Sequence, residues 1–260
     1  MRVLVTRPPH EAARWVDELQ SRGVDAVALP LIELGPTLQP QAVAEAWARF
    51  SGYSAAMFVS GAAAEYFFES NAALAPAEWS KFAIKTRCWA TGPGTAQALL
   101  RAGVDPAAVD LPPASATQLD SEALWQVVAP TVRPGQRVLI VRGSDAQGRS
   151  AGRDWLSRTL QAAGVTVDTV AAYARHAPML GAAQQALARQ SAGDGSLWIF
   201  SSSEAIANLA AALPAQDWGA ARCVATHPRI AQVARASGFG TVQAISPTLD
   251  AVVASIESRP

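Results

Sequence analysis

The sequence repeats a stretch that predicts a strand, a turn and a helix. Residues 87–104 read RCWATGPGTAQALLRAGV, and residues 222–239 read RCVATHPRIAQVARASGF. Both copies keep Arg-Cys-x-Ala-Thr-x-Pro at the same spacing, and both helical runs end at a glycine followed by an apolar residue. This agreement in spacing indicates a duplicated structural unit rather than a shared composition.

Further segments recur in the same order in the two halves of the chain. They are RVLVTR at 2–7 with RVLIVR at 137–142, LQSRGVDAVALP at 19–30 with LQAAGVTVDTVA at 160–171, and AAMFVSGAAAEYF at 55–67 with LWIFSSSEAIANL at 197–209. Each repeated unit is an apolar, β-branched run, a turn of small or polar residues, and an amphipathic stretch. Repeated βα units with short connections predict parallel sheets covered by helices, so the predicted fold class is α/β.

The first unit illustrates these signals. Val3 to Val5 form a continuous apolar run, as expected for a strand covered on both faces. Pro8 or Pro9 can open the following helix, because the N–H group of a first helical residue has no hydrogen-bond partner within the helix. Gly23 then stops the helix before the next strand.

Two stretches interrupt this rhythm. Residues 29–40 and residues 170–178 are extended and bounded by proline, which is typical of connecting segments. If both cross between lobes, one lobe is made from the two ends of the chain and the other from its middle.

Composition narrows the classes of partner. Half of the 260 residues are hydrophobic, 16% are charged, and the formal net charge is zero. Such a chain has no general attraction for nucleic acid or for an anionic membrane surface, so any charged ligand must be met locally. The opening residues lack a signal-peptide pattern and no apolar run is long enough to span a bilayer, which predicts a cytoplasmic protein.

The two cysteines occupy equivalent positions in the duplicated stretch. Cys88 and Cys223 each follow the arginine that opens their copy. Equivalent positions in two separate copies should lie apart, which disfavours a disulfide or a shared metal site.

A set of motifs spread along the whole chain resembles the uroporphyrinogen-III synthase family. The motifs are Thr6-Arg7-Pro8 after the first strand, LPLIEL at 29–34, Ser60 in a strand-end turn, TGPGTA at 91–96, VLIVRG at 138–143 with GRDWL at 152–156, and Tyr173 after a strand. The resemblance implies two similar α/β lobes, each a parallel sheet flanked by helices, joined by a two-stranded antiparallel linker with the active site in a cleft. Lobe 1 would contain residues 1–35 and 176–260, lobe 2 would be the inserted residues 38–172, and the linkers would be 33–40 and 170–178.

The resemblance also implies an activity. Enzymes of this family close the linear tetrapyrrole hydroxymethylbilane into uroporphyrinogen III on the route to haem, with loss of water and inversion of ring D. No cofactor is implied, and we expect a monomer. Closure without the enzyme gives the uninverted isomer, so the enzyme's task is mainly orientation.

Such a substrate carries eight carboxylates, which helix N-termini and arginine forks can bind. Tyr173 matches the family's candidate proton donor for the departing hydroxyl, although it could instead be an aromatic plug. Substrate contacts are expected from strand-end turns and helix starts, namely from Arg7, Ser60, Gly61, Thr95, Arg142, Gly143, Arg149, Arg153, Ser202, Ser203, Thr226 and His227.

Each of these residues also has a structural alternative. Arg7 could form a salt bridge that holds the linker, Thr95 could cap its helix, and Ser60 and Ser202 could bond within their own turns. One or two of the three arginines in the second lobe should meet the substrate, and the sequence does not choose among them.

The chain departs from the family pattern in two places. The turn HPRI replaces a Gly-Pro-Thr-Thr type turn, so His227 stands for glycine and Ile230 for a hydroxyl residue, unless Thr226 takes over that role. Val59 also replaces the usual threonine before Ser60. These changes leave open a degenerate family member that binds tetrapyrrole without converting it.

Other classes of protein fit the sequence less well. A noncatalytic bilobal binding protein would explain the duplication but not the family motifs. A dinucleotide-dependent oxidoreductase would require G-x-G-x-x-G, which TGPGTA does not provide. A response-regulator receiver would require acidic residues after the first strand, where Thr6, Arg7 and Pro8 stand instead.

Overall fold

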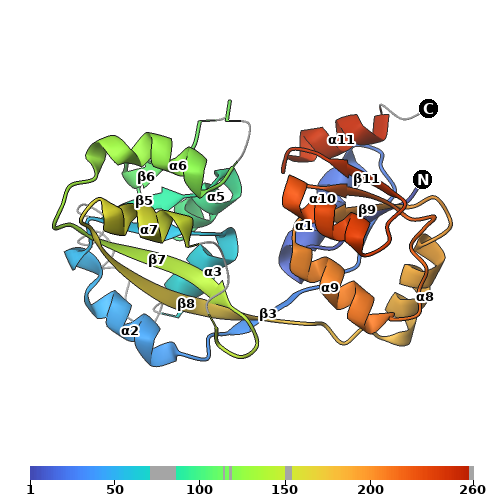
Figure 1. Ribbon diagram of the computed structural model, residues 1–260, viewed down its shortest axis with the longest axis horizontal. Coiled ribbons are helices and arrows are strands. Elements are labelled where there is room, and N and C mark those ends of the chain that lie inside the picture. Colours follow the sequence, from blue (N-terminus) through green and yellow to red (C-terminus); the bar gives the residue numbers. More distant parts are fainter. Residues whose placement is uncertain (71–85, 114, 117–118, 150–153, 258–260) are drawn as a thin grey trace. The chain divides into compact units, whose positions relative to one another are not determined.

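The computed structural model describes residues 1–70, 86–113, 115–116, 119–149 and 154–257 (Figure 1). The chain divides into two units. Unit 1 contains Met1–Leu34 and His176–Pro260, and unit 2 contains Gly35–Arg175. The chain passes from one unit to the other within β3 and at the end of β8.

Unit 1 is built on a five-stranded sheet in the order β11-β10-β9-β1-β2. Neighbouring strands in this order are paired in parallel. Its strands are β1 (Val3–Val5), β2 (Ala26–Ala28), β9 (Leu197–Phe200), β10 (Arg222–Ala225) and β11 (Thr241–Ala244). Its helices are α1 (Pro9–Ser21), α8 (Ala182–Ser191), α9 (Ser203–Ala212), α10 (Pro228–Ala236) and α11 (Leu249–Glu257).

Both faces of this sheet are covered by helices. Val3 and Val5 pack with residues of α1 and α11, whereas Leu4, between them, packs with residues of α8, α9 and α10. Successive side chains of a strand point to opposite faces, so a run of apolar residues is what a strand covered on both faces requires. Pro8 precedes α1, and Gly23, with a φ of 79°, follows its end.

Unit 2 is built on a six-stranded sheet in the order β3-β8-β7-β4-β5-β6. Its strands are β3 (Glu33–Pro36), β4 (Ala55–Phe58), β5 (Arg87–Ala90), β6 (Val109–Asp110), β7 (Arg137–Ser144) and β8 (Thr166–His176). Its helices are α2 (Pro40–Ala48), α3 (Gly61–Glu69), α5 (Pro93–Arg101), α6 (Ser121–Val128) and α7 (Trp155–Ala162). Short 3-10 turns lie at η1 (Phe50–Gly52), η3 (Pro106–Ala108) and η4 (Ala129–Thr131).

The two faces of this second sheet have different linings. On one face, Met57 and Ile140 pack with leucines and a valine of α6 and α7. On the other, Phe58 meets Phe67 and Phe68 of α3, in an aromatic cluster that also includes Trp47 of α2. Cys88 in β5 and Cys223 in β10 are both buried, each in the sheet of a different unit.

The duplicated segments occupy the same places in the two sheets. The order β2-β1-β9-β10-β11 in unit 1 corresponds, strand for strand, to β8-β7-β4-β5-β6 in unit 2. The chain enters the two arrangements at different strands, because β1 and β2 begin unit 1, whereas β7 and β8 end unit 2. This arrangement accounts for the repeated sequences, and the predicted α/β class is confirmed.

Candidate functional site

The hydroxyl of Tyr173 lies at the carboxyl end of the unit 2 sheet, close to that of Ser60. Tyr173 is near the end of β8, and Ser60 follows β4 and precedes α3. The two hydroxyl oxygens are 3.3 Å apart. Ligands of open α/β sheets commonly bind at this edge, so this pair is the centre of the candidate site.

A β-bulge sets the direction of the Tyr173 side chain. β7 and β8 are paired in regular register up to Arg142 opposite Ala171, and then Gly143 stands opposite Tyr173, so that Ala172 is the extra residue. A bulge moves the following side chains to the other face of the sheet. Val167, before the bulge, packs on the α7 side, whereas the Tyr173 ring lies 5.5 Å from the ring of Tyr66 in α3.

Gly143 makes room for this ring. A Cβ atom added at Gly143 would lie 2.5 Å from Cζ and 2.9 Å from the hydroxyl oxygen of Tyr173. Real Cβ contacts are not that short, so any other residue here would displace the ring. Gly143 is buried, and its lack of a side chain allows the Tyr173 ring to occupy this position.

Ser60 is tied to the start of α3. Its Oγ accepts a hydrogen bond of 3.1 Å from the backbone N–H of Ala63, which makes Ser60 the N-cap of the helix. Gly61 is the first helical residue, and a Cβ atom there would lie 3.5 Å from the carbonyl oxygen of Gly94 in α5. Gly61 thus serves the packing of α3 against α5.

Thr95 lies in the first turn of the neighbouring helix. α5 is preceded by Gly92, and Pro93 is its first residue. The Thr95 side chain is buried, with 6% of the residue exposed. Thr95 is therefore inside the helix rather than at its cap position.

The arginines expected in unit 2 are held by acidic neighbours. Arg142 is buried on β7, and its Nη1 lies 3.1 Å from Oδ1 of Asp154, the residue that precedes α7. Arg149 is largely exposed, and its Nε lies 2.8 Å from Oδ2 of Asp145. Arg153, the third predicted arginine, lies outside the described residues.

In unit 1, Arg7 follows β1 and packs on the helix that it precedes. Its Nη1 donates a hydrogen bond of 2.8 Å to Glu11, and its guanidinium carbon lies 4.0 Å from the centre of the Trp15 ring. Burial lowers the pKa of Arg7, and Glu11 opposes that effect. The Nε atom is buried and has no hydrogen-bond partner within the described ranges.

The neighbouring strand β9 is followed by three serines, of which Ser202 and Ser203 were predicted to contact the substrate. The Oγ of Ser202 accepts a hydrogen bond of 3.1 Å from the backbone N–H of Glu204, so Ser202 caps α9. The Oγ of Ser203 is buried and has no hydrogen-bond partner in the part of the chain that the structure describes.

The third strand end of unit 1 carries Thr226 and His227. Thr226 is buried, and its backbone N–H donates to the carbonyl of Phe200 at 3.0 Å. His227 precedes α10, and its Nδ1 accepts a hydrogen bond of 3.1 Å from the backbone N–H of Arg229. Because β10, β9 and β1 are neighbours, these residues share one edge of the sheet with Arg7.

In each unit, hydrogen-bond donors lie at the carboxyl ends of parallel strands, and in unit 2 the phenol of Tyr173 lies there as well. The N-termini of α3, α5, α9 and α10 bring partial positive charge to these edges, which suits carboxylate groups. Among the described residues there is no group of three or more His, Cys, Asp or Glu side chains able to hold a metal ion. No helix in the described ranges is long and apolar enough to cross a membrane.

Some neighbours of the site were not predicted. Tyr66 contacts the ring of Tyr173, and Asp154 pairs with Arg142, but neither was expected to do so. An acidic residue just before a helix could have indicated the second pair, because Asp154 shares a strand-turn-helix unit with Arg142. Nothing in the local sequence indicates the first, since it depends on the bulge in β8.

The sequence matches the model of a protein family described as uroporphyrinogen-III synthase HemD over residues 13–254. It is 33% identical over 151 residues to the uroporphyrinogen-III synthase of Chlorobaculum parvum. That alignment covers 56% of this chain and 54% of the relative, so the chain spans about half the length of the curated relative it matches.

Solved structures show the same fold. A mutant uroporphyrinogen III synthase from Thermus thermophilus has a TM-score of 0.57 at 15% identity, covering 99% of this chain and 97% of that one. The uroporphyrinogen-III synthetase from Helicobacter pylori has a TM-score of 0.61 at 13% identity, with both chains fully covered. At such identities the likeness concerns the fold alone.

Proposed function

This chain belongs to the uroporphyrinogen-III synthase family, and we propose on that basis that it closes hydroxymethylbilane into uroporphyrinogen III with inversion of ring D. The observation that carries the proposal is the hydroxyl of Tyr173, held beside the N-terminus of α3 at the carboxyl edge of its sheet. A phenol in that position can give a proton to a leaving hydroxyl group.

In the proposed reaction, Tyr173 protonates the terminal hydroxyl of the substrate. The C–O bond breaks with its electron pair going to oxygen, water leaves, and the remaining azafulvene is attacked by the substituted carbon of ring D. The resulting spiro intermediate fragments and closes again in the inverted sense. The proton that the pyrrole carbon loses on closure restores the phenol, so the net change is the loss of one water molecule.

The carboxylates of the substrate are assigned to the strand ends of both units. In unit 1 the proposed contacts come from Arg7, Ser202, Ser203, Thr226 and His227. The buried Nε of Arg7 and Oγ of Ser203 support this, because they have no hydrogen-bond partners among the described residues. In unit 2 the proposal assigns contacts to Gly61, Thr95, Arg142, Gly143, Arg149 and Arg153.

Burial limits how the substrate reaches Tyr173. Only 4% of this residue is exposed, whereas Ser60 is partly exposed. The proposal therefore requires the leaving hydroxyl to approach the Tyr173 oxygen from the side of Ser60. We further propose that the protein acts as a monomer in the cytoplasm, and sedimentation of the purified protein would test the first of these points.

The test is to supply enzymatically generated hydroxymethylbilane to the purified protein and to separate the oxidised products by isomer. Predominant type III uroporphyrin supports the proposal. Type I alone, as in a control without protein, would contradict it. Tight binding of uroporphyrinogen in that second case would instead support the degenerate binding protein, which the HPRI turn with His227 left open.

A further inference from the structure

We propose that Ser60 is a positioning residue that holds the Tyr173 hydroxyl and directs its proton toward the substrate. This role differs from the substrate contact expected from the sequence, and it rests on the proposed function of Tyr173. Three observations carry it: the hydrogen bonds at Ser60, the confinement of the Tyr173 ring, and the position of both hydroxyls at the start of α3.

The hydrogen bonds at Ser60 leave its hydroxyl proton available to the Tyr173 oxygen. The Oγ of Ser60 already accepts the backbone N–H of Ala63, at 3.1 Å. A serine hydroxyl has one proton to donate, and the Tyr173 oxygen lies 3.3 Å away. If Ser60 donates to Tyr173, both atoms have a partner and the phenol proton is left for a third group.

The Tyr173 ring has little freedom to leave this position. Gly143 presents its backbone to one part of the ring, where even a Cβ atom would not fit. The ring of Tyr66 lies 5.5 Å away, centre to centre, with an interplanar angle of 33°. The backbone carbonyl of Tyr173 lies 3.4 Å from the Oγ of Ser144. The ring is thus fixed by its packing, and Ser60 determines the direction in which the hydroxyl proton points.

The chain of hydrogen bonds also suits the charge that proton transfer would create. When Tyr173 gives up its proton, the negative oxygen keeps the hydrogen bond from Ser60. Ser60 in turn accepts the N–H of Ala63, one of the first-turn donors that give a helix its partly positive N-terminus. Ser60 therefore links the phenolate to the positive end of α3.

The experiment is a double-mutant cycle on turnover. Ser60→Ala should lower kcat about tenfold, as expected for one lost hydrogen bond, and leave KM nearly unchanged. Ser60→Thr keeps a hydroxyl and a helix cap, so it should retain kcat within about threefold. In a Tyr173→Phe background, Ser60→Ala should have no further effect on kcat. If Ser60→Ala lowered kcat by the same factor in the original protein and in Tyr173→Phe, the proposal would be overturned.

A matched control separates this effect from the loss of a helix cap. Asp120 caps α6 of the same unit, accepting the backbone N–H of Ala123 at 3.0 Å. Asp120→Ala should therefore reduce stability about as much as Ser60→Ala while leaving kcat unchanged. A fall in kcat in this variant as large as that of Ser60→Ala would count against a specific role for Ser60.

A second measurement does not depend on activity. The chain has three tyrosines, so protein labelled with ¹³C-tyrosine gives three ring signals, and Tyr173→Phe identifies the signal of Tyr173. Ser60→Ala should shift that signal, whereas Asp120→Ala should not. An unchanged signal in Ser60→Ala would overturn the proposal even if the protein makes type III product. If the Tyr173 signal shifts in Ser60→Ala but the unsubstituted protein makes only type I uroporphyrin, the contact between Ser60 and Tyr173 is supported and the proposed function is contradicted.

Discussion

At the scale of single residues, the shape of the site depends on the contact between Gly143 and Tyr173. A methyl group at Gly143 would overlap the ring, and the buried backbone of β7 cannot easily give way. Gly143→Ala should therefore lower the free energy of unfolding by about 1–3 kcal/mol, as overpacking commonly does, and should slow product formation. Urea denaturation measures the first effect.

The control for that substitution is Gly94→Ala. Gly94 lies in α5, and a Cβ atom there would meet nothing within 4 Å. Alanine is the better helix former by about 1 kcal/mol, so this variant should be as stable as the original protein or more so. Equal destabilisation by the two alanines would show that the Tyr173 contact is not the cause.

Tyr173→Phe tests the proton donor directly. Phenylalanine keeps the ring against Gly143 but has no proton to give, so kcat should fall about 100-fold while product affinity stays nearly unchanged. This is the lower end of what general acids contribute, because the substrate also reacts without an enzyme. Tyr66→Phe, which alters the adjacent ring in the same way, should keep full activity. Turnover at the original rate in Tyr173→Phe would remove this residue from the mechanism.

The sequence predicted most of the residues of the site, but it did not predict which of them contact one another. Ser60, Gly143 and Tyr173 were all expected to contribute, but as separate contributors. Their contact depends on the extra residue Ala172 in β8, which no periodicity in the sequence marks. Likewise, the pairing of Arg149 with Asp145 lies within a loop, where hydrophobic patterning carries no information.

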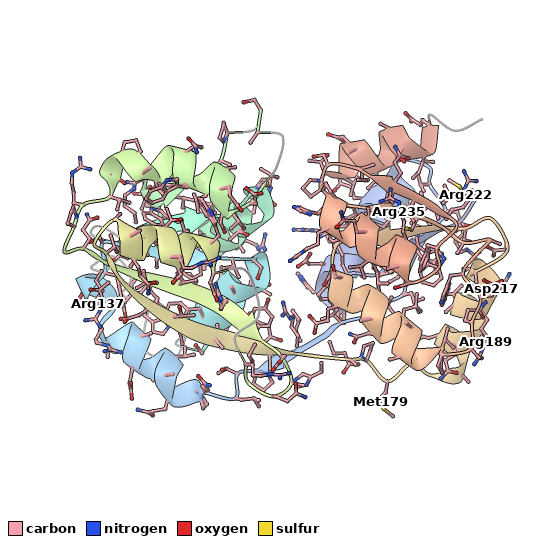
Figure 2. All side chains as sticks on the ribbon, in the orientation of Figure 1. Arg137, Met179, Arg189, Asp217, Arg222 and Arg235 are labelled. Carbon is pink, nitrogen blue, oxygen red and sulfur yellow. The ribbon has the colours of Figure 1, made fainter. Side chains whose placement is uncertain are left out.

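At the scale of secondary-structure elements, a polar cluster fixes the beginning of the β7–β8 pair. Arg137, labelled in Figure 2, opens β7, and its Nε donates a hydrogen bond of 2.8 Å to Asp168 of β8. The hydroxyl of Tyr53 donates to the same carboxylate at 2.7 Å. Burial, followed by the hydrogen bond to Asp168, raises the pKa of Tyr53 to about 12.

This raised pKa has a consequence at alkaline pH. The folded protein favours the protonated phenol, so the stabilisation is complete below about pH 10, the ordinary pKa of tyrosine, and is lost as the pH rises toward about 12. Tyr53→Phe should reduce the free energy of unfolding by about 1–2 kcal/mol at pH 8, and this deficit should shrink by pH 11. Denaturation at the two pH values measures it. A deficit that stayed constant would contradict the assignment.

Asp168 gives the opposite dependence. Burial alone raises the pKa of Asp168, but the hydrogen bonds from Arg137 and Tyr53 outweigh it and the pKa is lowered. Its stabilisation is therefore present above the ordinary aspartate pKa of about 4 and is lost as the pH falls below that value. Asp168→Asn should make the free energy of unfolding less sensitive to pH below about 4. An acid dependence equal to that of the original protein would contradict this.

The elements themselves were largely predictable from the sequence, because strands covered on both faces and amphipathic helices leave strong patterns. The residues at which these elements begin and end were harder to predict. The repeated segment RVLIVR ends at Arg142, whereas β7 continues to Ser144, held there by its pairing with β8. The stretch 29–40 was expected to be a connection, and β3 within it joins the six-stranded sheet at its edge.

At the scale of the whole molecule, the two units differ in how the chain builds them. Unit 2 is one continuous stretch, Gly35–Arg175, with its own sheet and apolar clusters, whereas unit 1 joins two distant stretches. A fragment of residues 35–175 should therefore fold cooperatively by itself. Far-UV circular dichroism during urea unfolding would test this.

The control is the fragment of residues 176–260. It contains β9, β10 and β11 but not β1 and β2, so the apolar residues of β9 that pack beside β1 would be exposed. This fragment should not unfold cooperatively. A cooperative transition for 176–260 and none for 35–175 would contradict the expectation that unit 2 is the part that folds by itself.

The discontinuity of unit 1 also matters while the protein is being made. Strand β1 leaves the ribosome before its neighbour β9, which follows only after all of unit 2. At about 5–20 residues per second, the intervening stretch takes on the order of ten seconds to synthesise. Throughout that time β1 is without this partner, so the newly made chain exposes an unpaired apolar strand edge until β9 has been synthesised.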